Sequence, residues 1–138
     1  MSQRALKKLR IGLIGAGGIV RQRHLPGLLA LPNVQVAAVC NSRIETAQRI
    51  AADFHIPEVV DDWADMLGRG DLDIIWIGTP PVLHAPITIS ALEAGKHVFC
   101  QARMAMNLRE GREMLAAAQA RPHNPRSVSG SAAGPRRA

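Results

Sequence analysis

Three glycines stand directly after the first apolar run of the chain, in the segment IGLIGAGGIV. Gly15 permits a tight turn at the end of a strand, and Gly17 leaves no Cβ between the backbone and a bound ligand. A helix that begins near Gly18 presents unpaired N–H groups and the positive end of its dipole to an anion. Glycines in this order between a strand and a helix predict a binding site for the pyrophosphate of a dinucleotide.

The third small-residue position of such a glycine fingerprint holds Val20 in this chain. Gly or Ala at that position lets the helix and the strand pack closely, so Val20 predicts a slightly wider approach. A turn that needs positive φ is the simpler interpretation of a glycine cluster. It accounts for one or two glycines but not for three beside a strand end, so we favour the nucleotide site.

The segment Asn41-Ser42-Arg43 ends the second predicted strand, where NAD-binding folds commonly place a carboxylate on the adenosine ribose. No carboxylate here repels a 2′-phosphate, and Arg43 can offer charge-assisted hydrogen bonds to one. The segment therefore predicts NADP in preference to NAD. In the alternative interpretation, Ser42 and Glu45 form a capping box for the next helix, and Arg43 is a solvated residue of its first turn.

A third group of candidate residues, Thr79-Pro80-Pro81-Val82-Leu83-His84, follows the fourth predicted strand. In a doubly wound sheet, ligands bind outside the carboxyl ends of the strands, so this loop should face the same crevice as the glycines. His84 can hydrogen-bond a ligand there. The alternative is that His84 only caps or packs the helix that it begins.

Short apolar runs without polar alternation predict strands that are covered on both faces. They are Leu9–Ile14, Val34–Cys40, Asp73–Ile77, His97–Cys100 and a weak one at Val59 and Val60. Helical periodicity and capping residues predict helices from near Gly18, over 44–54, from Asp62 to Gly68, over 84–94 and from Asn107 to Ala120. The alternation predicts an α/β fold with a doubly wound, mostly parallel sheet, the Rossmann-like NAD(P)-binding architecture.

The positive charge of the chain is concentrated at its ends. Of the 17 Lys and Arg residues, four lie in the first ten positions and four in the last eighteen, whereas all 11 Asp and Glu lie between residues 11 and 113. The middle has no basic stripe interleaved with aromatic residues, so we expect no nucleic-acid partner. No window is long and apolar enough for a membrane span and the first ten residues lack the core of a secretory signal, so we expect no membrane partner and a cytoplasmic protein.

The composition divides the chain into three parts. We expect a basic N-terminal extension over 1–8, a NAD(P)-binding domain over 9–121 and a tail over 122–138 that is too poor in apolar residues to be ordered. Cys40 and Cys100 lack the spacing of a zinc site or a disulfide framework, so we expect buried thiols and no metal.

The glycine loop, TPPVLH at 79–84 and ALEAGKHVFC at 91–100 together resemble the N-terminal half of the glucose-fructose oxidoreductase and inositol dehydrogenase (Gfo/Idh/MocA) family, over about residues 9–120. RHLPGL at 23–28 is similar to the first helix of that family. The resemblance implies a Rossmann domain that binds NAD or NADP, joined in complete members to a second α/β domain that supplies most of the substrate pocket. The implied reaction moves a hydride between the nicotinamide and a hydroxyl-bearing carbon, often of a sugar or cyclitol.

The resemblance also assigns roles to residues of this chain. It implies pyrophosphate contacts for Gly15, Gly17, Gly18 and Ile19. It implies contacts with the adenosine ribose for Ser42 and Arg43, and contacts on the ribose and nicotinamide side for Thr79, Pro80 and His84. Gln101 is a further candidate for a cofactor contact through its amide.

Two departures from the family pattern bear on catalysis. After the fifth strand most members carry Glu-Lys-Pro, whose Lys assists proton transfer, but this chain has Gln101-Ala102-Arg103. A guanidinium is a poor proton shuttle, so we assign no catalytic residue. The second departure is that the substrate domain is absent from the 138 residues, which therefore represent a fragment, a truncated reading frame or a stand-alone module. We expect that this chain alone does not turn over.

Three functions remain open at this point. The favoured one is the cofactor domain of an NAD(P)-dependent oxidoreductase. The second is a non-catalytic module for nucleotide binding or protein interaction. In the third, the segment from Met104 to Met106 and the helix from Leu108 to Ala118, which would lead toward the missing domain, expose apolar surface through which the chain self-associates.

Overall fold

The computed structural model of the protein describes residues 8–101 and 104–120. Five strands form its sheet: β1 (Leu9–Ile14), β2 (Val34–Cys40), β3 (Glu58–Val59), β4 (Ile74–Ile77) and β5 (His97–Cys100). Three of them, β1, β2 and β5, have the predicted bounds, because each is a short and mainly apolar run. The expected basic N-terminal extension falls mainly on residues 1–7, which lie outside the described residues, as do Ala102, Arg103 and the predicted tail.

The helices alternate with the strands along the chain. They are a π-helical turn η2 (Val20–His24) continuous with α1 (Leu25–Leu29), α2 (Ile44–Phe54), α3 (Trp63–Leu67), a 3₁₀ turn η3 (Pro81–Leu83) leading into α4 (His84–Glu93), and α5 (Leu108–Gln119). Asn107 caps α5 as predicted, since its Oδ1 accepts a hydrogen bond of 2.9 Å from the N–H of Glu110. Gly95, with φ of +87°, follows α4 in the left-handed conformation that commonly ends a helix.

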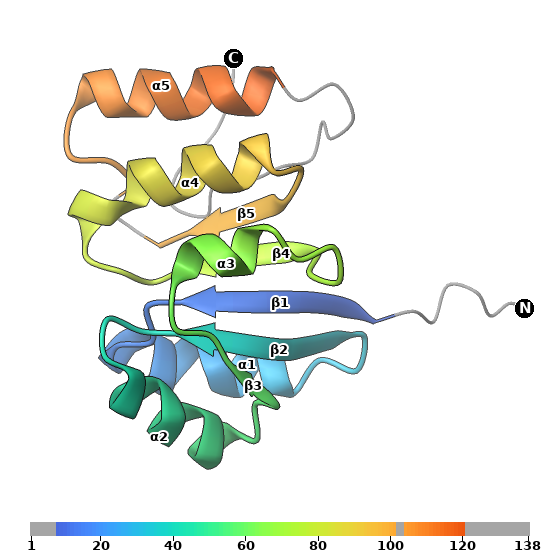
Figure 1. The fold of residues 1–138 in the computed structure, drawn as a ribbon. Helices are drawn as coiled ribbons and strands as arrows, with labels where there is room; N and C mark the ends of the chain where they lie inside the picture. The colour runs from blue at the N-terminus through green and yellow to red at the C-terminus, as the bar shows by residue number, and fades with distance from the viewer. Residues whose placement is uncertain (1–7, 102–103, 121–138) are drawn as a thin grey trace, which may run out of the picture.

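All strand pairs are parallel, in the order β3-β2-β1-β4-β5. The chain starts in the centre at β1, moves outward to β3, and then crosses back to β4 on the other side of β1. The strand order therefore reverses between β1 and β4, and the carboxyl ends of both strands lie at the same edge (Figure 1). In doubly wound sheets, a crevice for ligands forms at this reversal.

The sheet has an apolar core on each face. On one face, α1 and α2 pack over β1 and β2 around Leu13, Val39 and Ile50. On the other face, α3 and α4 pack over β1, β4 and β5 around Met66, Ile77 and Ile87, and α5 lies against α4 (Figure 1). The expected doubly wound α/β fold is therefore confirmed.

The aromatic residues of β4 and β5 cluster on the α1 side of the sheet. The rings of Trp76 and Phe99 are stacked with centroids 3.9 Å apart, and the His24 ring meets Trp76 edge-on. The indole N–H of Trp76 donates a hydrogen bond of 3.1 Å to Nδ1 of His24. Burial lowers the pKa of His24, which favours the neutral ring that accepts this bond. Through His24, the π-helical turn that follows the glycines is therefore bonded to the aromatic cluster of β4 and β5.

Within the described residues, no helix is long and apolar enough to cross a bilayer. Cys40 and Cys100 are free and buried, as predicted.

Candidate functional site

A pocket of about 270 Å³ opens at the carboxyl edge of the sheet, at the reversal between β1 and β4. It is formed by the ends of β1, β2 and β4 and by the starts of α3 and η3. The residues that line it are Ile14, Gly15, Ala16, Gly17, Cys40, Asn41, Ser42, Trp63, Gly78, Thr79, Pro80 and Leu83. The pocket thus brings together the glycine loop, the end of the second strand and the loop after the fourth strand, as the sequence predicted.

Gly15 brings the β1 and β4 loops into contact. Its φ is +84°, in the region that favours glycine, and a Cβ placed on it would lie 2.5 Å from the backbone nitrogen of Thr79. The N–H of Gly15 donates a hydrogen bond of 2.8 Å to the carbonyl of Cys40. A side chain at this position would therefore push apart the loops that form the floor of the pocket.

Gly78 explains how Val20 is accommodated at the third fingerprint position. A Cβ on Gly78 would lie 2.5 Å from Cγ2 of Val20, so the absence of a side chain on this residue, directly after β4, makes room for the valine on the helix. Val20 itself is buried in the core on the α1 side. The small residue that compensates for Val20 is thus supplied by the loop that follows β4.

Gly17 and Gly18 have open space where a side chain would be. No heavy atom lies within 4 Å of a Cβ built on either residue. The helix begins at Gly18, and the N–H groups of a first helical turn have no partner within the helix. Gly17 lines the pocket, and Ile19 beside it is half exposed. The geometry fits a pyrophosphate, because the glycine loop leaves room for an anion where the backbone donors and the helix dipole are directed.

Asn41 holds the glycine loop in place. Its Oδ1 accepts a hydrogen bond of 2.6 Å from the N–H of Ala16, and its Nδ2 donates one of 3.1 Å to Oγ1 of Thr46. The side chain at the position where NAD-binding folds commonly carry a carboxylate therefore joins the glycine loop to the first turn of α2. Sequence reasoning missed this role, because Ala16 is 25 residues away from Asn41 in the chain and only the fold brings the two together.

The predicted capping box of α2 is wrong. The residue that precedes the helix in the N-cap position is Arg43, and no side chain caps the helix there. Instead, Thr46 donates its hydroxyl to the carbonyl of Arg43, with an oxygen–oxygen distance of 2.8 Å. The box fails because the helix starts one residue later than a Ser42 cap requires. Ser42 is exposed and lines the pocket.

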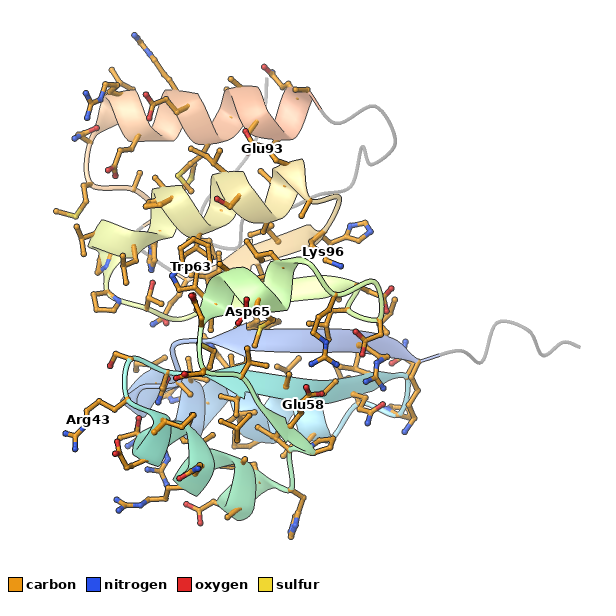
Figure 2. All side chains as sticks on the ribbon, in the orientation of Figure 1. Arg43, Glu58, Trp63, Asp65, Glu93 and Lys96 are labelled. Carbon is orange, nitrogen blue, oxygen red and sulfur yellow. The ribbon has the colours of Figure 1, made fainter. Side chains whose placement is uncertain are left out.

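Arg43 extends from the rim of the pocket into solvent (Figure 2). Its side chain is 73% exposed, and its Nε lies 3.8 Å from a carboxylate oxygen of Glu45. An ion pair of this length between exposed groups contributes little to stability. The guanidinium is thus available to an anion near Ser42.

His84 lies behind the pocket wall. It is completely buried, and its Nε2 lies 2.8 Å from the carbonyl oxygen of Thr79, to which it donates. Thr79 and Pro80 line the pocket, whereas His84 does not. Gln101 continues from β5 at the same edge: its N–H donates to the carbonyl of Ile77 at 2.9 Å, and its Oε1 would lie 3.2 Å from a Cβ on Gly78.

Trp63 and Cys40 also reach the pocket without having been predicted there, and Leu83 comes from the loop that was predicted to face it. Burial, followed by the charges of the nearby aspartates at 61, 62 and 65, raises the pKa of the Cys40 thiol to about 11. Cys40 is therefore a neutral thiol near pH 7 and serves as an apolar wall. Leu83 and Trp63 enter the wall from η3 and from the first turn of α3, which follow β4 and β3 in the chain.

The fold and this crevice define a dinucleotide-binding domain of the Rossmann type. Residues 9–124 match the oxidoreductase family with an NAD-binding Rossmann fold, the Gfo/Idh/MocA family. The chain belongs to that family, and the resemblance of its glycine, TPPVLH and ALEAGKHVFC segments is confirmed.

Relatives and solved structures agree with this assignment. The chain is 34% identical over 113 residues to dTDP-3,4-didehydro-2,6-dideoxy-alpha-D-glucose 3-reductase of Actinomadura kijaniata, covering 82% of this chain and 34% of that protein. It is 35% identical over 106 residues to D-glucoside 3-dehydrogenase of Escherichia coli (strain K12), covering 77% of this chain and 30% of that protein.

A solved 3-ketoreductase from Actinomadura kijaniata, in complex with NADP and TDP-benzene, superposes with a TM-score of 0.78 at 33% identity, covering 83% of this chain and 35% of that one. Levoglucosan dehydrogenase, in complex with NADH and L-sorbose, gives a TM-score of 0.79 at 29% identity, covering 83% of this chain and 33% of that one. The chain thus spans about a third of the length of the relatives it matches, and that third is their NAD(P)-binding domain.

Proposed function

We propose that this chain binds NADP in preference to NAD and acts as the cofactor domain of an oxidoreductase for hydroxyl-bearing carbons, such as those of a sugar or cyclitol. The observation that carries the proposal is the pocket at the strand reversal, which an open glycine loop lines and beside which Arg43 is exposed next to the lining residue Ser42. The sugar-related names of the relatives support the substrate class.

The described residues divide the cofactor between them. Gly15, Gly17, Gly18 and Ile19 receive the pyrophosphate, and Ser42 and Arg43 bind the adenosine ribose and its 2′-phosphate. Thr79, Pro80 and Gln101 continue the site toward the nicotinamide. His84 serves this site as a positioning residue, because its bond to the Thr79 carbonyl fixes the loop that carries Thr79 and Pro80.

When bound, the nicotinamide supplies hydride transfer to or from the carbon that is reduced or oxidised. The contribution of this chain is to bind and orient the cofactor, and we assign no catalytic residue within it. The rival proposal, a non-catalytic module, shares the cofactor site. The two proposals differ in whether the bound cofactor takes part in hydride transfer. Turnover by the isolated 138 residues would count against the non-catalytic module.

The substitution Gly17→Val tests the binding site with little risk to the fold. Nothing lies within 4 Å of the added Cβ, so the chain should fold, while the side chain fills the space intended for the pyrophosphate. We expect the NADPH affinity measured by calorimetry to fall at least about 100-fold, which corresponds to roughly 3 kcal/mol. Gly111→Val on α5, which also has open space, is the matched control and should bind as the wild type does. Unchanged affinity in Gly17→Val would overturn the proposal.

The substitution Arg43→Ala tests the choice of cofactor separately. Loss of a charge-assisted contact to the 2′-phosphate should reduce the ratio of NADPH to NADH affinity about 10-fold. Arg49→Ala removes an exposed positive charge from the same helix and should leave the ratio unchanged. If the ratio of NADPH to NADH affinity were the same in Arg43→Ala and the wild type, Arg43 would be a solvated residue without a role in cofactor choice. The proposal for the glycine loop would be unaffected.

We also propose self-association. Met106, Leu108 and Leu115 are exposed in and before α5, where the sequence predicted an apolar surface. A sizing column distinguishes a monomer of 14.9 kDa from a larger species, and a monomer at all concentrations would contradict this proposal.

A further inference from the structure

We infer that the ring of Trp63 is the wall on which the adenine of the cofactor stacks. The inference rests on the proposed function, because it assigns one side chain to one part of the same ligand. Sequence reasoning gave Trp63 no role.

The position of Trp63 is fixed by the start of α3. Trp63 is the first residue of this helix, and Oδ1 of Asp62 caps the helix by accepting a hydrogen bond of 3.0 Å from the N–H of Ala64. The indole is partly buried and packs against the core shared by α3 and α4. Figure 2 shows the side chain reaching from the first turn of α3 toward the start of α4. One part of the ring is thus anchored in the core while another lines the pocket.

The ligand groups assigned to the glycine loop and to Arg43 determine which part of the cofactor Trp63 meets. The 2′-phosphate is carried by the adenosine ribose, and the base is attached to the neighbouring carbon of that ribose. With the ribose at Ser42, the adenine must lie within one sugar length of Ser42. Trp63, Cys40 and Leu83 are apolar residues that line the same pocket as Ser42, and Trp63 is the aromatic one.

The chemistry of these three residues suits a flat heteroaromatic ring. Cys40 is a neutral thiol, Leu83 is aliphatic and Trp63 supplies a broad π surface. Stacking on an aromatic side chain tolerates any base orientation that keeps the faces parallel, and it contributes about 5- to 150-fold to affinity per base. Trp63 would therefore increase affinity for the adenine half without selecting between NADP and NAD.

The second tryptophan provides a control within the same chain. Trp76 is already stacked on Phe99 and bonded to His24 on the α1 side of the sheet, away from the pocket. The chain has only these two tryptophans. Trp76→Phe therefore reports the fluorescence of Trp63 alone, and Trp63→Phe reports that of Trp76 alone.

The experiment titrates both variants with 2′,5′-ADP, which carries the adenine and the 2′-phosphate but no nicotinamide. We expect saturable quenching of emission in Trp76→Phe and none in Trp63→Phe. In parallel, calorimetry with NADPH should show about 5- to 150-fold weaker binding by Trp63→Leu and a smaller loss in Trp63→Phe, which keeps an aromatic face.

The outcomes separate this inference from the proposed function. If the wild type binds neither NADPH nor 2′,5′-ADP, the proposed function fails and the role of Trp63 fails with it. If the wild type binds, but the emission of Trp63 does not change or Trp63→Leu binds as tightly as the wild type, only the role of Trp63 is overturned. The fluorescence titration uses the native Trp63, so it gives an answer even if Trp63→Leu does not fold.

Discussion

The two ends of the sheet treat their polar groups in opposite ways. At the amino ends of the strands, charged side chains are paired with one another and with the backbone. At the carboxyl ends, the glycine loop and Arg43 face open space. Figure 2 shows Lys96 at the first end, and Arg43 and Trp63 at the other.

Arg69 is the centre of the network at the amino ends. Its Nε and Nη2 donate to the two carboxylate oxygens of Asp71 at 3.0 and 2.7 Å, and its Nη1 lies 2.5 Å from Glu58 at the start of β3. Arg10 of β1 adds a hydrogen bond of 3.2 Å to the same Asp71 carboxylate. Such a bidentate, shared arrangement gives each charge a partner within the protein.

The carboxyl ends direct the backbone donors of the glycine loop toward the pocket. This difference between the two ends distinguishes polar groups that stabilise the fold from polar groups that can bind a ligand. Where charged groups are mutually paired, they connect loops and strands and need no ligand. Where the backbone turns sharply at glycine beside a pocket, the N–H groups of the first helical turn are directed toward a ligand that is not part of the chain.

The largest loss of stability without loss of cofactor binding is expected from Lys96→Met, at the amino ends of the strands. Lys96 is only 7% exposed, and its amine donates to the carbonyls of Arg69 and Leu72, the latter at 2.9 Å. Methionine keeps the apolar stem but leaves both carbonyls without this donor, so the free energy of unfolding in urea should fall by about 2–3 kcal/mol. NADPH affinity should stay within about twofold, since the site lies at the other end of the sheet. Lys8→Met, at an exposed position, is the control. A large loss of affinity with unchanged stability would contradict the division between the two ends.

A smaller effect, on both stability and NADPH affinity, is expected from Asn41→Ala. The change removes the bond of 2.6 Å that holds the Ala16 N–H and the link to Thr46, so stability should fall by about 1 kcal/mol. Because the glycine loop loses its tether, NADPH should bind several-fold more weakly. Calorimetry and urea unfolding measure the two effects. Loss of stability alone would show that the loop keeps its shape without Asn41.

The smallest effect is expected from a change of pH at the amino ends. The hydrogen bonds from Arg69 lower the pKa of Asp71 to about 2. Since the folded-state pKa lies below that of the unfolded chain, the contribution of Asp71 to stability is complete above about pH 4 and is lost as the pH falls toward 2. Unfolding of the wild type and Asp71→Asn should therefore differ most near neutral pH and converge near pH 2. A difference that stays constant from pH 6 to 2 would contradict the pairing with Arg69.

Local sequence features were sufficient for much of the fold. The strand Val34–Cys40 and the helix Ile44–Phe54 have the predicted bounds, because uninterrupted apolar runs and helical periodicity are local signals. The glycine loop was predicted for the same reason, since its strand, turn and helix are contiguous in sequence.

The parts of the site that sequence reasoning missed depend on contacts across the fold. Val20 fits because Gly78 lacks a side chain, and Asn41 acts through Ala16, 25 residues away. His84 is buried behind the loop, and its burial depends on how α4 packs against the sheet. Trp63 reaches the pocket because the short α3 meets α4, and nothing in its neighbouring residues signals that meeting.

Hydrogen exchange of the wild-type chain, with and without saturating NADPH, tests the central claim most directly because it observes both ends of the sheet at once. The account predicts slower exchange over residues 15–20, 42–46 and 78–84 on binding, and no change over 69–73. Exchange that does not change at the glycine loop, or protection confined to the network around Arg69, would contradict it.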